Sequence, residues 1–292
     1  MKKLVFTFAT CCIMCACEQK TETNPFFTEF RTEYGAPDFD KIKIEHYEPA
    51  FLKGIEEQNA EIKAIVESRE TPGFENTIVA LDNSGRTLAR VKGVFYALTE
   101  ADTNDEMSAL SEKIAPVLSE HNDNIYLNQD LYKRVAAVWQ QEQEGKITLT
   151  TEQHRLLDRY YKAFIRSGAG LDTGKQNRLR EINKELSTLA ITFSNHVLNE
   201  NNAYRLVIDN EAELAGLPEW VKTGAAEEAK AVGKEGKWLF TLQNSSRLPL
   251  LQYADNRELR KDIYEAYINR GNNGDANDNK EILKKIISLR LE

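Results

Sequence analysis

The residues of this chain that could do metal chemistry are few. There are four histidines, His46, His121, His154 and His196. A hydrolytic zinc site on a helix needs two histidines at positions i and i+4, so that both imidazoles reach one ion, with a glutamate beside the first to deprotonate the bound water. No two of these histidines have that spacing, and neither H-E-x-x-H nor H-x-x-E-H occurs. We therefore predict no metal site and no catalytic residue in this chain.

The histidines are better explained by structural roles. We expect His121 to be an imidazolium favoured by the dipole at a helix C-terminus, and His154 to be exposed in the first turn of a helix. His196 falls at the edge of an apolar helix seam, and His46 stands where it can help to begin a helix.

Other chemistries have no matching motif in the sequence. No G-x-S-x-G elbow occurs, and the glycines of residues 168–174 lack both a Walker lysine and a preceding strand. The formal net charge is −8, and no basic stripe is present. Because non-specific binding to a phosphate backbone depends on clustered Lys and Arg, we expect no nucleic-acid partner.

The N-terminus has the pattern of an export signal. Lys2 and Lys3 precede an apolar stretch that is too short to span a bilayer, so we predict a signal peptide over residues 1–16. The sequence Met14-Cys15-Ala16-Cys17 resembles a bacterial lipobox, which predicts lipidation of Cys17 and a polar tether over residues 17–23. The predicted location is the bacterial cell envelope, on the exported side and anchored in the membrane by lipid. The alternative is an ordinary cleaved secretory signal.

Helical periodicity dominates the rest of the chain. Apolar residues repeat at helical spacing over 47–68, 75–101, 105–121, the segment after Asn128, and the segment from Thr150, where Thr150 and Gln153 fit a capping box. From 175 to 201 the spacing alternates between three and four, which predicts a seam held between two neighbouring helices. Two segments, 204–208 and 237–242, alternate like strands and flank a short helix near Pro218. The predicted fold class is mostly α with a small two-stranded β ribbon.

A block near the C-terminus carries a more specific pattern. It consists of residues 237–242 (KWLFTL), 246–249 (SRLP) and 253–261 (YADNRELRK). This block resembles the thimet oligopeptidase and peptidyl-dipeptidase family of zinc metallopeptidases, and a weaker match extends back to Asn24-Pro25-Phe26. Within it we expect Asn256 to cap a helix that starts at Arg257. An alternative places Arg247 and Tyr253 in a peptide cleft, and we do not select them as site residues.

The resemblance implies a multi-helix channel-wall domain and short peptides as substrates. It also implies zinc as the cofactor of the full-length family member, held by a motif downstream of this block, with none bound by this chain. We therefore predict an N-terminal helical domain over residues 24–203, and a strand–helix–strand unit with the truncated start of the peptidase domain over 204–292. The helix of residues 277–292 ends without a stop signal, which fits that reading.

Two functions remain open. The first is the channel-forming part of a zinc oligopeptidase or dipeptidyl carboxypeptidase, inactive by itself, with internal and C-terminal cleavage both possible for the whole enzyme. The second is a non-catalytic peptide-binding or scaffolding helical lipoprotein. An excess of exposed apolar surface on the last two helices favours the first, and a closed monomer favours the second.

Overall fold

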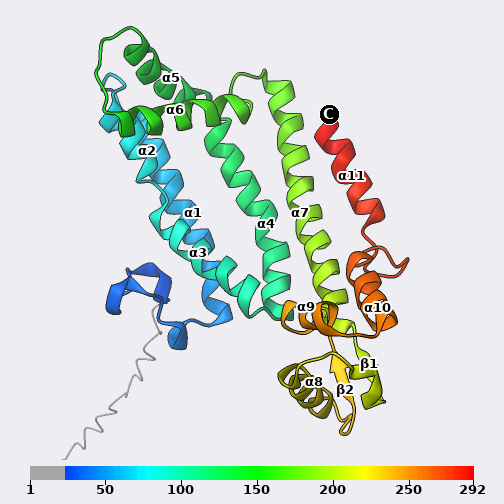
Figure 1. The fold of residues 1–292 in the computed structure, drawn as a ribbon. Helices are drawn as coiled ribbons and strands as arrows, with labels where there is room; N and C mark the ends of the chain where they lie inside the picture. The colour runs from blue at the N-terminus through cyan, green and yellow to red at the C-terminus, as the bar shows by residue number, and fades with distance from the viewer. Residues whose placement is uncertain (1–23) are drawn as a thin grey trace, which may run out of the picture.

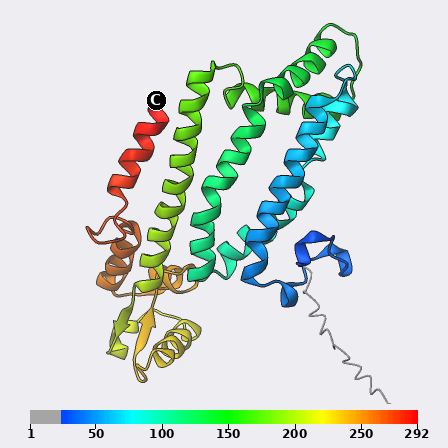
Figure 2. The ribbon, with the colours of Figure 1, turned by 180° about the vertical axis from the view of Figure 1, so that it is seen from behind.

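The computed structural model describes residues 24–292. The predicted signal peptide, the lipidation site Cys17 and the tether lie outside the described residues. The described part is mostly helical, as predicted. Its helices α1, α4, α7 and α11 stand side by side, and we call this row of helices the wall (Figures 1 and 2). None of the helices in residues 24–292 combines the length and apolarity that crossing a bilayer requires.

One end of the chain forms an aromatic core. Short 3-10 turns at Pro25–Phe27, Glu33–Gly35 and Phe39–Lys41 lead into α1 (Ile44–Glu67), which packs on α3 (Arg86–Ala101) and α4 (Asp105–Tyr126). Phe51 and Phe95 are fully buried there, with their ring centres 5.3 Å apart and their planes nearly perpendicular. This edge-to-face geometry adds stability beyond that of the buried area.

The helix predicted over residues 75–101 is interrupted. The chain forms a π-helical turn at Phe74–Val79 and a single turn, α2 (Ala80–Asp82), and α3 begins only at Arg86. Gly85 adopts a φ of 73° between them, and its backbone N–H donates to Glu61 at 2.7 Å. Because an L side chain rarely adopts that φ, the Asn83-Ser84-Gly85 sequence marks a break that apolar periodicity alone does not reveal.

The next helices begin where their caps predict. Asn128 accepts hydrogen bonds from the first turn of α5 (Gln129–Gln143), and Thr150 and Gln153 form the expected capping box at α6 (Thr151–Arg166). Across the two helices, Trp139 stacks on Tyr161 with ring centres 4.4 Å apart and planes 9° apart. The two helices lie across one end of the wall (Figure 1).

Helix α7 (Thr173–Ala203) is the longest element, and it lies between α4 and α11 (Lys280–Leu291), as the seam predicts. Of the apolar seam positions, only Ile182 is buried, whereas Leu186, Leu189, Phe193 and Val197 are half-buried. The predicted pair of neighbours is confirmed. The three helices form a single layer, which leaves the seam partly uncovered.

A small unit closes the opposite end of the wall. Strands β1 (Leu206–Ile208) and β2 (Trp238–Phe240) pair antiparallel, with Leu206 opposite Phe240. Between them lie a 3-10 turn (Glu211–Leu214) and α8 (Glu219–Ala231), and after them come α9 (Asn244–Tyr253) and α10 (Arg257–Ile268). The ribbon confirms the prediction, and Asn256 caps α10 as expected.

Candidate functional site

His121 is buried, and its surroundings favour the neutral imidazole over the imidazolium that we predicted. Helix α4 continues to Tyr126, so His121 does not lie at a helix C-terminus. Its side chain is 5% exposed, and Nε2 is 2.7 Å from Oε1 of Gln58. Burial lowers the pKa of His121, and the charge of Lys92 lowers it further.

The other three histidines each have a different partner. His46 accepts a hydrogen bond from the backbone N–H of Lys43 at 3.1 Å, which confirms its role at the start of α1. His154 is exposed, as predicted, and its Nδ1 is 2.8 Å from Glu142 Oε1. Nδ1 of His196 is 2.9 Å from the side-chain oxygen of Asn279.

The described residues do not provide a zinc site. Within residues 24–292, no three His, Cys, Asp or Glu side chains come together in a way that could hold a metal ion. The donor set here therefore does not fit the zinc that the resemblance implies, and no catalytic step is assigned to this part of the chain.

A polar clasp joins α7 to the loop before α11. Asn279 is 4% exposed, and its side chain donates to the carbonyl of Phe193 at 3.0 Å while its oxygen faces His196. The backbone of Asn279 donates to the carbonyl of Gly271 at 2.7 Å, and Gly271 donates to Glu200 at 2.8 Å. Two segments far apart in the sequence are thereby held together.

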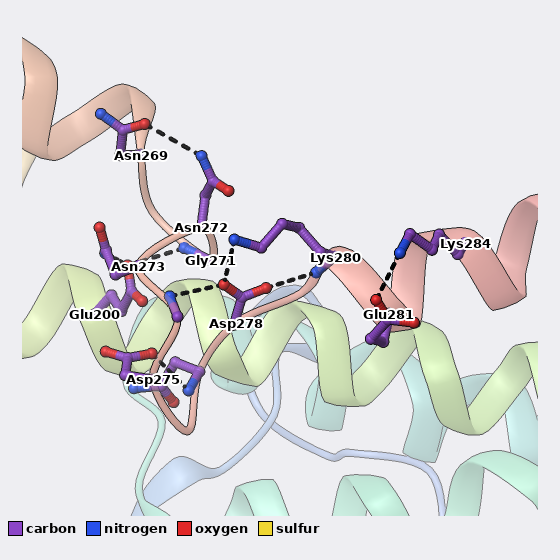
Figure 3. Close-up of polar contacts among 12 residues, drawn as sticks. Glu200, Asn269, Gly271, Asn272, Asn273, Asp275, Asp278, Lys280, Glu281 and Lys284 are labelled. Atoms are coloured by element: carbon purple, nitrogen blue, oxygen red, sulfur yellow. Dashed lines mark hydrogen bonds and ion pairs between the residues drawn. The ribbon is translucent and has the colours of Figure 1, made fainter.

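Figure 3 shows the loop side of this clasp. Asp278 accepts hydrogen bonds from the backbone of Gly274 at 2.7 Å and of Lys280 at 2.9 Å, and the Lys280 ammonium lies 2.9 Å from the same carboxylate. Hydrogen bonds from Lys280 are the main cause that lowers the pKa of Asp278 to about 2. The carboxylate thus fixes the first turn of α11.

The most distinctive hollow of the described residues lies where α7, α9 and α10 meet. We call it the arginine pocket. Its volume is about 430 Å³, and its lining residues come from all three helices and the turn before α9: Ser194, Val197, Leu198, Asn201, Leu242, Gln243, Asn244, Tyr267 and Arg270. Its size falls within the range of about 300–1,000 Å³ that is usual for ligand sites.

Two guanidinium groups stack on Tyr267, which lines this pocket, and of the two arginines only Arg270 is itself a lining residue. The guanidinium carbons of Arg247 and Arg270 are 3.5 Å and 3.9 Å from the centre of the Tyr267 ring. Arg247 is 7% exposed and donates to the carbonyl of Leu242 at 3.3 Å and to the side chain of Asn244 at 2.6 Å. Neither Arg247 nor Tyr253 lines the pocket, and Tyr253 is 39% exposed.

The charge of the arginine pocket is unbalanced. Neither Arg247 nor Arg270 forms an ion pair with a carboxylate in residues 24–292, and no acidic residue lines the pocket. Four other hollows of the described part are each lined by at least one Asp or Glu. Arg270 is the single charged side chain among the lining residues of this pocket.

Comparison with characterised proteins shows which family the chain belongs to. The chain is 38% identical over 272 residues to a dipeptidyl carboxypeptidase of Escherichia coli, covering 93% of this chain and 40% of that protein. It is 32% identical over 274 residues to oligopeptidase A of Salmonella typhimurium, covering 92% and 39%. The chain belongs to the thimet oligopeptidase and peptidyl-dipeptidase family.

This membership confirms the relationship indicated by residues 237–242 and 253–261. A similarity to saccharolysin of Saccharomyces cerevisiae, 25% identical over 225 residues, is more distant. No family model matches the chain. The chain spans about two fifths of the length of the first two peptidases that it matches.

Proposed function

We propose that this chain is the channel-forming part of a zinc peptidase of the oligopeptidase or peptidyl-dipeptidase type that acts on short peptides. The residues that bind zinc and perform hydrolysis would belong to a further part of the protein. The similarity to a dipeptidyl carboxypeptidase and an oligopeptidase A, over about two fifths of their lengths, supports this proposal.

The observation that carries the proposal is the apolar surface of the last two helices. Large apolar side chains of α10 and α11 are about half exposed or more: Tyr264, 52%; Ile268, 54%; Leu283, 48%; Ile287, 50%; and Leu291, 82%. The seam of α7 beside them is only half-buried. Several large apolar side chains exposed on neighbouring parts of one protein are typical of an interaction face, and we propose that the remainder of the peptidase covers them.

The same observation weighs against the non-catalytic alternative. A protein that kept only a channel wall would gain by closing or polarising these helices, because exposed apolar surface favours aggregation. The half-exposed residues of α10 and α11 instead favour a larger folded unit.

The decisive experiment starts from the natural gene. We would sequence the reading frame beyond codon 292 and determine the size of the native protein with an antibody raised against this chain. The longer product and the 292-residue chain would then be assayed on a set of short peptides, with and without a chelator. We expect the longer product alone to hydrolyse peptides, and the chelator to stop it. A native protein of this size without activity would support the scaffolding alternative, and hydrolysis by the short chain would contradict the assignment of chemistry elsewhere.

For the location, we propose a lipid anchor at Cys17 on the exported side of a bacterial envelope. Stable attachment needs more than one acyl chain, which a diacylated cysteine would provide. Metabolic labelling with a fatty-acid analogue tests this. The label should appear on the protein and disappear in Cys17→Ser, whereas labelling of Cys17→Ser would contradict the assignment.

A further inference from the structure

We propose that the three short turns of residues 25–41 rest on the surface of a lipid bilayer, which they contact through exposed aromatic side chains. We call residues 25–41 the turn segment. The nearness of the bilayer rests on the proposed lipid anchor at Cys17, and the contact itself rests on the described residues. The partner is a zwitterionic lipid surface.

Three aromatic side chains of the turn segment are exposed. Tyr34 is 96% exposed, Phe39 is 53% exposed and Phe27 is 37% exposed. Rings left in water forfeit the free energy that their burial would contribute. Aromatic rings with a polar edge, such as that of tyrosine, are enriched where a membrane meets water. The exposed side chains of the turn segment are therefore of the kind that a lipid surface accommodates.

Tyr34 also has an unusual backbone conformation. Within residues 24–292 it is the one residue other than glycine with a positive φ, at 60°. This region is unfavourable for an L side chain, and such residues cluster where the position of a side chain serves a function. The described chain leaves the Tyr34 ring almost wholly uncovered, so packing within it does not account for the strain. A lipid surface supplies the missing contact.

The turn segment is fixed to the wall on its inner side. Phe26 is fully buried against Tyr47, with ring centres 5.2 Å apart, and its carbonyl accepts a hydrogen bond from Arg90 at 2.9 Å. Just before the segment, Asn24 donates to the carbonyl of His46 at 2.7 Å. The exposed rings therefore extend from a fixed base, which reduces the entropy that is lost when they meet a surface.

The proposed anchor lies close to the turn segment along the chain. Only residues 18–23 separate Cys17 from Asn24, and this stretch can span at most about 25 Å. Helix α1 begins beside the turns, and its 24 residues extend about 36 Å to the end of the wall where α5 and α6 lie (Figures 1 and 2). An anchor at Cys17 would thus keep the turn segment, rather than α5 or α6, next to the bilayer.

The charge of the turn segment favours a zwitterionic surface over an anionic one. Residues 25–41 contain two basic and four acidic side chains, so their formal charge is 2 − 4 = −2. One of the basic side chains, Lys41, is paired with Asp38 at 2.6 Å. Attraction to anionic lipid needs clustered Lys and Arg, which these residues lack. The contact therefore depends on apolar area and not on charge.

The test places a fluorescent probe in the turn segment. A hexahistidine tag replaces residues 1–17 and holds residues 18–292 on phosphatidylcholine vesicles with nickel-chelating lipid, so the contact is measured whether or not Cys17 is lipidated in the cell. All four cysteines lie within residues 1–17, so Ala36→Cys supplies the one thiol for an NBD probe. We expect vesicles to shift its emission to the blue and to raise it at least about twofold, because the probe leaves water.

A probe at Gln143→Cys, at the end of α5, is the positional control. Gln143 is exposed, and its probe should show no change on the same vesicles. Unchanged emission of the Ala36→Cys probe, or an equal change at both positions, would overturn the proposal.

Variants assign the contact to the aromatic rings. Tyr34→Ser combined with Phe39→Ser should abolish most of the response of the probe at Ala36, and because both rings are exposed the protein should remain folded, which circular dichroism checks. The matched control is Tyr264→Ser combined with Ile268→Ser, which removes two half-exposed side chains from α10 and should keep the response. A response that survives in the first pair, or that is lost equally in the second, would contradict the proposal.

Further arms separate lipid from other partners. Phosphatidylglycerol in the vesicles should not strengthen the response, and a response that requires it would overturn the assignment to a zwitterionic surface. A blue shift that appears without vesicles as the protein concentration rises would assign the turns to a second copy of the chain. A blue shift that the longer gene product shows without vesicles would assign them to the rest of the peptidase, and either result would overturn the proposal. Fatty-acid labelling of Cys17 is measured separately, so failure of the anchor is distinguishable from failure of this surface.

Discussion

The guanidinium of Arg247 lies 3.5 Å from the centre of the Tyr267 ring, although the two residues belong to different helices, α9 and α10. The contact joins α9 to α10, the helix that precedes the clasp at α11. A cation over an aromatic ring is stabilising, more so when it is desolvated, and Arg247 is 7% exposed. This pair therefore holds together two helices of the small unit.

Arg247→Gln should destabilise the fold. The substitution removes the ring contact and the hydrogen bonds to Leu242 and Asn244, and it should lower the free energy of unfolding by about 1–3 kcal/mol. Urea denaturation followed by circular dichroism measures the change. Arg205→Gln, at an exposed arginine, should change it by less than about 0.5 kcal/mol, and similar losses in both variants would contradict the prediction.

Gly85→Ala should destabilise the protein by more than about 1 kcal/mol. Gly85 has a φ of 73°, and an added Cβ would lie 2.4 Å from the side chain of Gln58. Gly93→Ala is the matched control, because Gly93 lies inside α3 with no neighbour within 4 Å of an added Cβ. The control should raise the free energy of unfolding by roughly 0.5–1 kcal/mol. A neutral Gly85→Ala would show that the turn at 83–85 adapts freely.

Ile287→Lys should have different effects on the 292-residue chain and on the longer product. Ile287 is 50% exposed on α11, so in the 292-residue chain the change should alter the free energy of unfolding by no more than about 0.5 kcal/mol. In the longer product the same lysine would be placed in the proposed covered face, and it should lower the melting temperature and the peptidase activity. Leu289→Ala, at a residue 5% exposed on the same helix, should cost about 2–5 kcal/mol in the short chain itself. If Ile287→Lys leaves the longer product unchanged, the α11 face is not covered there.

Acid should weaken the fold partly through His121. Because the pKa of His121 is lower in the folded protein, the unfolded chain takes up the proton first as the pH falls. The contribution is present above the unfolded value of about 6.5, and it is lost progressively as the pH falls from there toward the folded pKa. Denaturation between pH 7.5 and 5 should therefore show a smaller decline in stability for His121→Gln than for the parent. Parallel slopes in His121→Gln and the parent would contradict the role of His121.

Local signals in the sequence predicted much of the fold correctly. Asn128, Thr150 and Asn256 each begin a helix as expected, because a cap depends only on its own side chain and the next three residues. The ribbon followed from alternation over a few residues, and Leu206 pairs with Phe240 in the structure. The family relationship depended on such local patterns as well.

Features that depend on distant contacts were not predictable in the same way. The protonation of His121 was predicted wrongly because the extension of α4 to Tyr126 and the burial by Gln58 are not visible in its local sequence. The arginine pocket combines positions of α7, α9 and α10 that no periodicity associates, and α9 itself was not predicted. The only sequence signal for the pocket was that Arg247 and Arg270 lack an acidic residue at helical spacing on their own segments.

The hydrogen bond from the backbone N–H of Asn279 to the carbonyl of Gly271 closes the intervening residues into a loop. This hydrogen bond is 2.7 Å long. Glu200 of α7 binds Gly271 at one end of the loop, and His196 of α7 binds Asn279 at the other. The tip of this loop, residues 275–276, lies outside the contacts that Gly274 makes with Asp278 and that Asn277 makes with Asn199 of α7, so it does not set the direction of α11. Changes in its length are expected to be neutral to the wall, which makes this tip a suitable place to insert an affinity tag or a fluorescent reporter without displacing α11.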